Sequence, residues 1–182
     1  ISRFRLGFAP EGRGRLRDTL ARDGVTPAQM VAAGLLIQPD GDSGERRKLY
    51  DRFRQRVIFP ILDRRGRPIA FGGRILGDGE PKYLNSPETP LFRKGCVLYN
   101  LNQAAAQARK ADTIVVTEGY MDVIALDRVG FTHAVAPLGT ALTEDQIQLL
   151  WRVVREPVLC FDGDEAGGRA AARAAERALP LL

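Results

Sequence analysis

Residues 113–126 read TIVVTEGYMDVIAL, and this stretch decides the fold. It joins a β-branched apolar run to an acid, a glycine and a segment with helical character. The same order follows twice, because THAVAPLG (132–139) precedes TEDQIQLLWRVV (143–154), and EPVLCFDGD (156–164) precedes EAGGRAAARAAERAL (165–179). This alternation predicts right-handed βαβ units, and therefore an α/β fold with a mainly parallel sheet flanked by helices.

The first hundred residues have a different pattern of short elements separated by Gly and Pro turns. RLRDTLARDG (15–24) and TPAQMVAAGL (26–35) predict two short helices, the second with Thr26 as N-cap and Gly34 as stop. VIFPIL (57–62) and PIAFGG (68–73) predict a hairpin, and NLNQAAAQARKA (100–111) predicts a helix that starts near Asn100 or Asn102. We therefore expect a mixed α+β lobe over residues 1–110 and a second lobe over residues 111–182, truncated at its C-terminal end.

Composition limits the class of protein. The chain has 182 residues, of which 45% are hydrophobic and 27% charged, so it can bury a core as one domain or two small lobes. Apolar runs stay well below the roughly 20 residues that span a bilayer, and the sequence predicts a soluble cytoplasmic protein without membrane contact. Two separated cysteines and one histidine argue against a disulfide framework, a zinc site and any two-histidine mechanism. The net charge of +5 favours a polyanionic partner.

Four acids follow the strands of the predicted parallel sheet. Glu118 ends the first strand, Asp162 and Asp164 end the third, and Asp122 lies one helical turn after Glu118. Because ligands bind beyond the carboxyl ends of such strands, we expect the four carboxylates to meet at one sheet edge. Their mutual repulsion would be relieved by Mg²⁺ or Mn²⁺, which prefer carboxylate oxygens and can promote phosphoryl-transfer chemistry.

Each acid also has a purely structural interpretation. The sequence Asp162-Gly163-Asp164 is compatible with an Asx turn that caps the last helix. Glu118 and Gly119 are compatible with an ordinary strand-to-helix turn, and Asp122 with a charge that complements the helix dipole. Glu118 is also compatible with a general acid or base. The joint placement of all four at one edge favours the metal site.

A basic stretch precedes the parallel sheet. Its positive residues are opposed only by Asp51 and Asp63, and they are Arg46, Arg47, Lys48, Arg52, Arg54, Arg56, Arg64, Arg65, Arg67 and Arg74. Arginine forks bind phosphates, so we interpret these side chains as phosphate contacts, with a solvated basic face as the alternative. Lys82, Asn85 and Lys94 follow in segments anchored by prolines and suited to hold a nucleotide, and Tyr83 is one of the nearby aromatic residues that can stack on bases. There is no Walker A sequence and no GxGxxG motif.

These motifs together resemble a known family. TEGYMDVIAL (117–126) and FDGDEAGGRAA (161–171) are similar to the Toprim domain of primases, topoisomerases and nucleases. LGFAPEG (6–12) and the stretch from YDRFRQRVIFPIL through FGGR, KYLNSPET and FRKG (50–95) resemble the bacterial replicative primase family of the DnaG type. The resemblance covers essentially the whole chain.

The resemblance implies an RNA polymerase domain that makes short RNA primers on single-stranded DNA from ribonucleoside triphosphates with divalent metal. It implies metal binding by Glu118, Asp162 and Asp164, with Asp122 as a further catalytic acid. Residues that match positions used for template, nucleotide or initiation are Arg52, Arg54, Arg74, Lys82, Tyr83, Asn85 and Lys94. It further implies regulation by guanosine tetraphosphate at the same nucleotide pocket. The replicative helicase and single-strand-binding protein would be partners through regions absent here.

Three departures from the family pattern limit the expected activity. The zinc module, the third acidic motif (Asp-Pro-Asp) and the helicase-binding region of the family are not in this sequence. Residues 1–182 alone are therefore expected to make primer poorly or not at all. Two alternatives stay open: a catalytically silent module that binds nucleic acid or a regulatory nucleotide, and another Toprim nuclease or topoisomerase. A topoisomerase would need a nucleophilic tyrosine, for which the sequence offers no obvious candidate.

Overall fold

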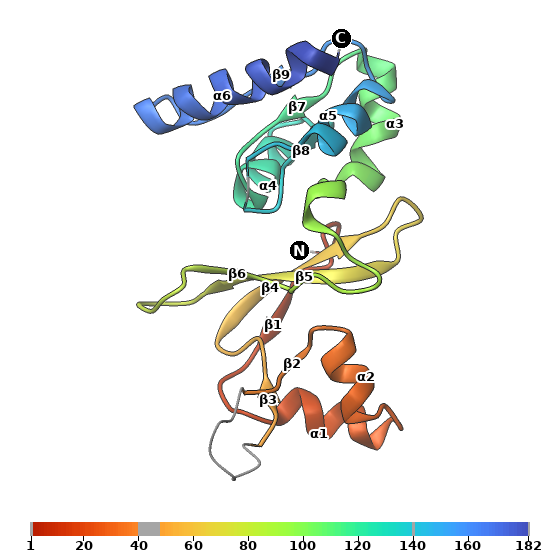
Figure 1. Ribbon diagram of the computed structural model, residues 1–182, viewed down its shortest axis with the longest axis vertical. Coiled ribbons are helices and arrows are strands. Elements are labelled where there is room, and N and C mark those ends of the chain that lie inside the picture. The colour runs from red at the N-terminus through yellow and green to blue at the C-terminus, as the bar shows by residue number, and fades with distance from the viewer. Residues whose placement is uncertain (1, 40–47, 140, 182) are drawn as a thin grey trace. The chain divides into compact units, whose positions relative to one another are not determined.

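The structure is a computed structural model, and it describes residues 2–39, 48–139 and 141–181. The chain divides into two compact units (Figure 1). The first unit combines Ile1–Pro60 with Ile69–Phe92, and the second combines Ile61–Pro68 with Arg93–Leu182. Within the described residues, no helix is long and apolar enough to cross a membrane.

A four-stranded sheet forms the centre of the first unit. Its order is β1 (Gly7–Ala9), β4 (Arg56–Leu62), β5 (Pro68–Ile75) and β6 (Tyr83–Asn85). The β4–β5 hairpin confirms the prediction from residues 57–73. At its turn the Asp63 carboxylate accepts the backbone N–H groups of Arg65 and Arg67 at 2.8 and 2.9 Å. Pro60 fits in β4 because the pairing with β1 reaches only Ile58, so no ladder bond to β1 is required of it.

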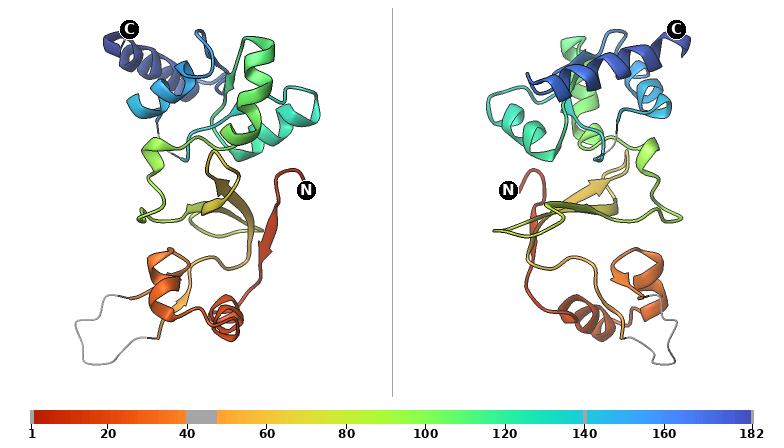
Figure 2. Two further views of the ribbon diagram at one scale, coloured as in Figure 1. Left: turned by 90° about the vertical axis from the view of Figure 1, so that its right-hand side faces the viewer. Right: turned by 60° about the vertical axis from the view of Figure 1, so that its left-hand side comes forward.

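Two short helices and a two-stranded ladder complete the first unit. Helices α1 (Arg15–Arg22) and α2 (Pro27–Ala32) lie beside β2 (Leu36–Ile37) and β3 (Tyr50–Asp51), as Figure 2 shows. Thr26 caps α2 through a capping box with Gln29, as predicted. Gly34 ends this segment with φ of +69°, and a Cβ at this position would lie 2.6 Å from Pro87. Both the left-handed turn and the close approach therefore require glycine.

The second unit holds the predicted parallel sheet. The strands β7 (Val115–Val116), β8 (Ala134–Val135) and β9 (Val158–Leu159) pair in the order β8-β7-β9, and both pairings are parallel. Around them lie α3 (Leu101–Ala111), α4 (Tyr120–Arg128), α5 (Glu144–Trp151) and α6 (Glu165–Ala178) (Figure 1). A 3-10 turn, η1 (Lys94–Cys96), precedes α3, and a second, η2 (Leu179–Leu181), follows α6. The predicted fold class is confirmed.

The core of the second unit includes residues upstream of the expected lobe boundary at residue 110. Leu98, Leu101 and Ala108 share one buried cluster with Ile114 and Val116 of the sheet. Helix α3 therefore packs as part of the parallel-sheet unit. The lobe boundary at residue 110 stays a prediction, while the larger segment of the second compact unit runs from Arg93 to Leu182.

Candidate metal centre and nucleic-acid surface

The predicted acids follow the carboxyl ends of two neighbouring parallel strands, β7 and β9. Val116 of β7 lies opposite Leu159 of β9, so the segments after these strands leave the sheet at the same edge. The Glu118 Oε1 atom accepts a hydrogen bond from the backbone N–H of Asp162 at 2.7 Å. Residues 44 positions apart thus meet at this edge, as βαβ topology predicted.

Asp122 and Asp164 both cap helices. The Asp122 Oδ2 atom accepts the Gly119 N–H at 2.9 Å at the start of α4. The Asp164 Oδ1 atom accepts the Gly167 N–H at 2.8 Å at the start of α6. One carboxylate oxygen of each of these two acids therefore has the structural role, at the start of a helix, that the sequence offered as the alternative to a metal site. A capping bond does not exclude a ligand role, because a carboxylate has two oxygens and about four acceptor positions.

Gly167 is a site residue that sequence reasoning did not identify. A Cβ built on Gly167 would lie 2.0 Å from the backbone oxygen of Asp162. Only glycine lets the first turn of α6 approach the backbone of the Asp162–Asp164 segment this closely. The glycine pair at 167–168 was the available signal, because glycine inside an otherwise good helix usually has a packing reason.

The four carboxylates form the candidate donor set for a divalent cation. Glu118, Asp122, Asp162 and Asp164 are all exposed, and their oxygens are the donors that hard cations prefer. Within the described residues, however, no three His, Cys, Asp or Glu side chains are gathered closely enough to hold a metal ion. Carboxylate oxygens suit a hard divalent cation, and the Glu118 carboxylate contacts the Asp162 backbone. The described part of the chain, however, does not bring three such ligands together. The metal assignment therefore stays a prediction.

The arginines of the first unit contact backbone carbonyls and aromatic rings. Arg52 donates from Nε and Nη2 to the carbonyl of Asn85 at 3.1 and 3.0 Å, and burial lowers the pKa of its guanidinium. Arg54 lies 4.8 Å from the centre of the Tyr50 ring and also donates to the Asp51 carbonyl. The Arg52 guanidinium thus connects β6 to the segment between β3 and β4. The predicted contact of Arg52 with phosphate stays a prediction.

Arg56 has a structural role that the sequence did not reveal. Its side chain is 5% exposed, and its Nη1 atom lies 3.3 Å from the carbonyl of Lys82 and 3.5 Å from that of Gly73. Burial, followed by the nearby charge of Arg54, lowers the pKa of its guanidinium. Sequence alone cannot separate this buried cation from the half-buried and exposed basic residues around it, because all of them lie in one basic run.

Four of the predicted nucleic-acid residues lie in β5, in β6 or next to β6. Arg74 of β5 lies opposite Tyr83, and its guanidinium carbon lies 5.9 Å from the centre of that ring. Tyr83 is 44% exposed, so an arginine–aromatic pair is open to solvent on this strand. Lys82 is exposed and Asn85 half-buried. Lys94 lies in η1 of the second unit, and Arg46 and Arg47 lie outside the described residues.

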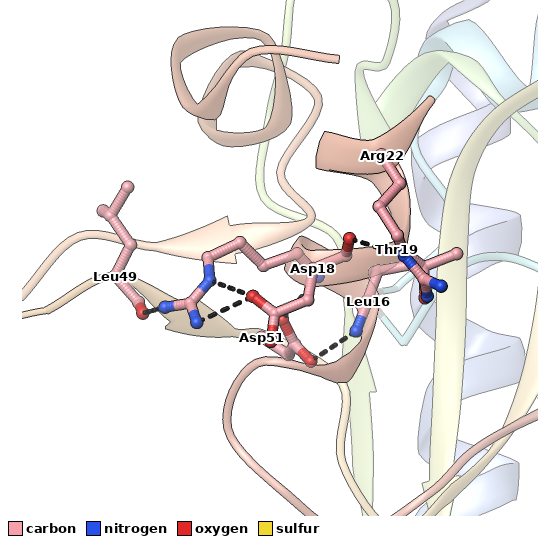
Figure 3. A network of polar contacts seen from close by, with 7 residues as sticks. Leu16, Asp18, Thr19, Arg22, Leu49 and Asp51 are labelled. Carbon is pink, nitrogen blue, oxygen red and sulfur yellow. Dashed lines mark hydrogen bonds and ion pairs between the residues drawn. The ribbon is translucent and has the colours of Figure 1, made fainter. Parts of the chain in front are cut away.

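Asp51 also has a structural role that the sequence did not reveal, in addition to opposing the charge of the arginines. Its carboxylate is buried and accepts the N–H groups of Leu16 and Arg17 at 2.9 and 3.1 Å, which caps α1 from 34 residues away (Figure 3). Arg17 pairs with Asp18 and donates to the Leu49 carbonyl, and this network joins α1 to β3.

A basic lobe with an antiparallel sheet, followed by acids at the edge of a parallel sheet, is the arrangement expected of a Toprim-containing protein. Two family models agree: "DNA primase catalytic core, N-terminal domain" matches residues 1–105, and "Toprim domain" matches residues 112–181. The chain belongs to the bacterial DNA primase family of the DnaG type.

Relatives and solved structures agree with this assignment. The DNA primase of Pseudomonas aeruginosa is 55% identical over 98% of this chain and 26% of its own length. That of Escherichia coli K12 is 47% identical over the whole chain and 30% of its own length. The chain thus spans less than a third of these relatives.

Among solved structures, a DNA primase domain from P. aeruginosa has a TM-score of 0.88 at 54% identity, covering 98% of this chain and 55% of its own. A DnaG primase catalytic domain bound to single-stranded DNA has a TM-score of 0.87 at 48% identity, covering 100% and 55%. The RNA polymerase domain of Mycobacterium tuberculosis DnaG, in complex with a double-stranded DNA oligomer with an overhang, has a TM-score of 0.85 at 38% identity, covering 96% and 55%.

Proposed function

We propose that this chain is part of the catalytic core of a primase that synthesises short RNA primers on single-stranded DNA from ribonucleoside triphosphates. The observation that carries the proposal is the contact between the Glu118 carboxylate and the Asp162 backbone at the edge of the Toprim sheet. It brings two of the acids that match the family motif to one place. The relative solved with single-stranded DNA supports a template of that kind.

The acids would hold divalent metal, Mg²⁺ or Mn²⁺. Glu118, Asp162 and Asp164 would supply the carboxylate oxygens, with Asp122 nearby in the first turn of α4. Bound metal would polarise phosphate oxygens and lower the pKa of an attacking hydroxyl. Glu118 itself holds the Asp162 backbone N–H and so fixes where the Asp162–Asp164 segment starts.

The basic surface of the first unit would bind phosphates. Arg54 and Arg74 lie against exposed or half-buried tyrosines, and such pairs suit both phosphate contact and stacking with unpaired bases. In the first unit, Lys82 just before β6, Asn85 on β6 and Arg52, which bonds to the Asn85 carbonyl, would add further contacts to template or nucleotide. In the second unit, Lys94 of η1 would contribute a contact of its own. Guanosine tetraphosphate would compete for the same nucleotide contacts.

The test is the variant Glu118→Gln in the primase polypeptide that contains this chain, with Glu176→Gln as control because Glu176 is an exposed residue of α6. Loss of one metal-binding charge should lower primer synthesis by at least about 100-fold. Binding of single-stranded DNA should change little, and the control should retain full synthesis. Asp162→Asn should behave like Glu118→Gln.

Two results would contradict the proposal. Synthesis that survives Glu118→Gln would remove the metal assignment. Salt-sensitive DNA binding by the wild type, with no Mg²⁺- or Mn²⁺-dependent nucleotide binding and no synthesis, would instead favour a silent binding module.

A further inference from the structure

The turn η1, which carries Lys94, is held by the N-terminal cap of α5. The side-chain amide of Gln146 donates from Nε2 to the carbonyl of Lys94 at 3.0 Å and to that of Val97 at 2.8 Å. The Thr143 hydroxyl donates to the carbonyl of Gly95 at 2.5 Å. Two carbonyls of this short turn, and the carbonyl of Val97 directly after it, are thus bound by two side chains about fifty residues away in sequence.

Both polar atoms of the Gln146 side chain take part in hydrogen bonds. It is 0% exposed, its two amide hydrogens serve the two carbonyls, and its Oε1 atom accepts the backbone N–H of Thr143 at 3.1 Å. The Thr143 hydroxyl oxygen in turn accepts the Gln146 N–H at 3.2 Å. A capping box needs only the last two bonds, so the bonds to the carbonyls of Lys94, Gly95 and Val97 are additional to what α5 requires. Such satisfied buried networks impose one geometry.

We propose that Thr143 and Gln146 are positioning residues that set the place of Lys94 for its contact with the nucleotide. The inference rests on the proposed function, in which Lys94 touches the ribonucleoside triphosphate. A three-residue 3-10 turn has poor internal hydrogen bonding. A lysine on such a turn acts as a point charge on a flexible stem, so its effect on a phosphate depends on where its backbone is held. The cap of α5 supplies that support.

The test is kinetic. In the primase polypeptide that contains this chain, Gln146→Met removes both donors and the acceptor while keeping side-chain length. We expect the KM for ribonucleoside triphosphate to rise by about 10-fold, the effect of losing one to two hydrogen bonds, with a smaller change in kcat. The control is Gln148→Met, because Gln148 is an exposed residue on the same helix.

A double-mutant cycle with Lys94→Ala separates positioning from general stability. If Gln146 acts through Lys94, Gln146→Met should raise KM in the wild-type background but change it little when Lys94 is already alanine. An equal rise in both backgrounds, or no rise in either, overturns the inference. Failure of the proposed function looks different, because the wild-type protein itself would then make no primer.

Thr143 provides a second pair of variants should Gln146→Met fail to fold. Thr143→Val removes the hydroxyl bond to Gly95 and keeps the shape, whereas Thr143→Ser restores the hydroxyl. We expect Thr143→Val to raise KM and Thr143→Ser to bring it back near the wild-type value. If valine and serine give the same KM, the hydroxyl does not position Lys94 and the inference is wrong.

Discussion

At the scale of single residues, Asp51 connects the basic segment to a helix. Its buried carboxylate satisfies two N–H groups at the start of α1, which no bond within the helix can satisfy. Asp51→Ala should therefore lower the free energy of unfolding by about 1–3 kcal/mol, and Asp51→Asn by less, because an amide oxygen still accepts. Urea denaturation followed by circular dichroism measures this. Asp18→Ala is the control, since the Asp18 side chain is 63% exposed and its pair with Arg17 should contribute under about 1 kcal/mol.

Asp63 gives a prediction on pH. The backbone N–H of Arg67, and then the Arg67 guanidinium and the Arg65 N–H, hold the pKa of the Asp63 carboxyl below its usual range. Stabilisation by a carboxylate with a lowered pKa is complete above the unfolded-state value of about 3.9 and is lost as pH falls through the lowered value. The Tm of Asp63→Ala should therefore lie below that of the wild type at pH 7, and the gap should close toward pH 2–3. A gap that is the same at both pH values would show that the carboxylate charge is not the cause.

At the scale of elements, the sequence predicted those helices and strands that are determined by local signals such as capping residues and apolar periodicity. Capping residues and apolar periodicity predicted α2, α5 and the strands of the parallel sheet, because each depends on neighbours in sequence. The contacts of Arg52, Arg56 and Asp51 could not be predicted, because each partner carbonyl or N–H lies 17 to 35 residues away. The sequence predicted that Glu118 and the Asp162 segment converge, but it could not show how Asp122 and Asp164 divide their oxygens between helix caps and metal.

Helix α6 tests how the acidic segment is built. At Gly167 a Cβ would overlap the Asp162 carbonyl, whereas at Gly168 it would meet nothing within 4 Å. Gly168→Ala should stabilise the protein by about 0.5–1 kcal/mol through helix propensity. Gly167→Ala should instead destabilise it by about 2 kcal/mol or more and shift the Asp162–Asp164 segment, because backbone must move. Thermal unfolding of the two variants measures this difference, and equal Tm values would contradict the close approach.

At the scale of the whole molecule, two units of different chemistry share one chain. The net charge of +5 is not spread evenly, because the stretch from Arg46 to Arg74 carries ten basic residues against two acidic ones. The four candidate acids all belong to the second unit, whereas six of the seven candidate nucleic-acid residues belong to the first. Template binding and metal binding should therefore respond to separate sets of substitutions.

The salt dependence of template binding tests this separation. A protein that neutralises phosphates of single-stranded DNA releases about 0.7 counterion for each contact, so the logarithm of its binding constant falls linearly with the logarithm of salt concentration. Arg74→Ala removes the cation beside the exposed Tyr83 ring and should make that slope shallower by about 0.7. Arg173→Ala on α6 is the control, since Arg173 is exposed but lies in the second unit. Fluorescence anisotropy of a labelled oligonucleotide across a salt series measures both slopes. If Arg74→Ala leaves the slope unchanged, or Arg173→Ala alters it equally, binding follows total charge and β5–β6 is not part of the DNA surface.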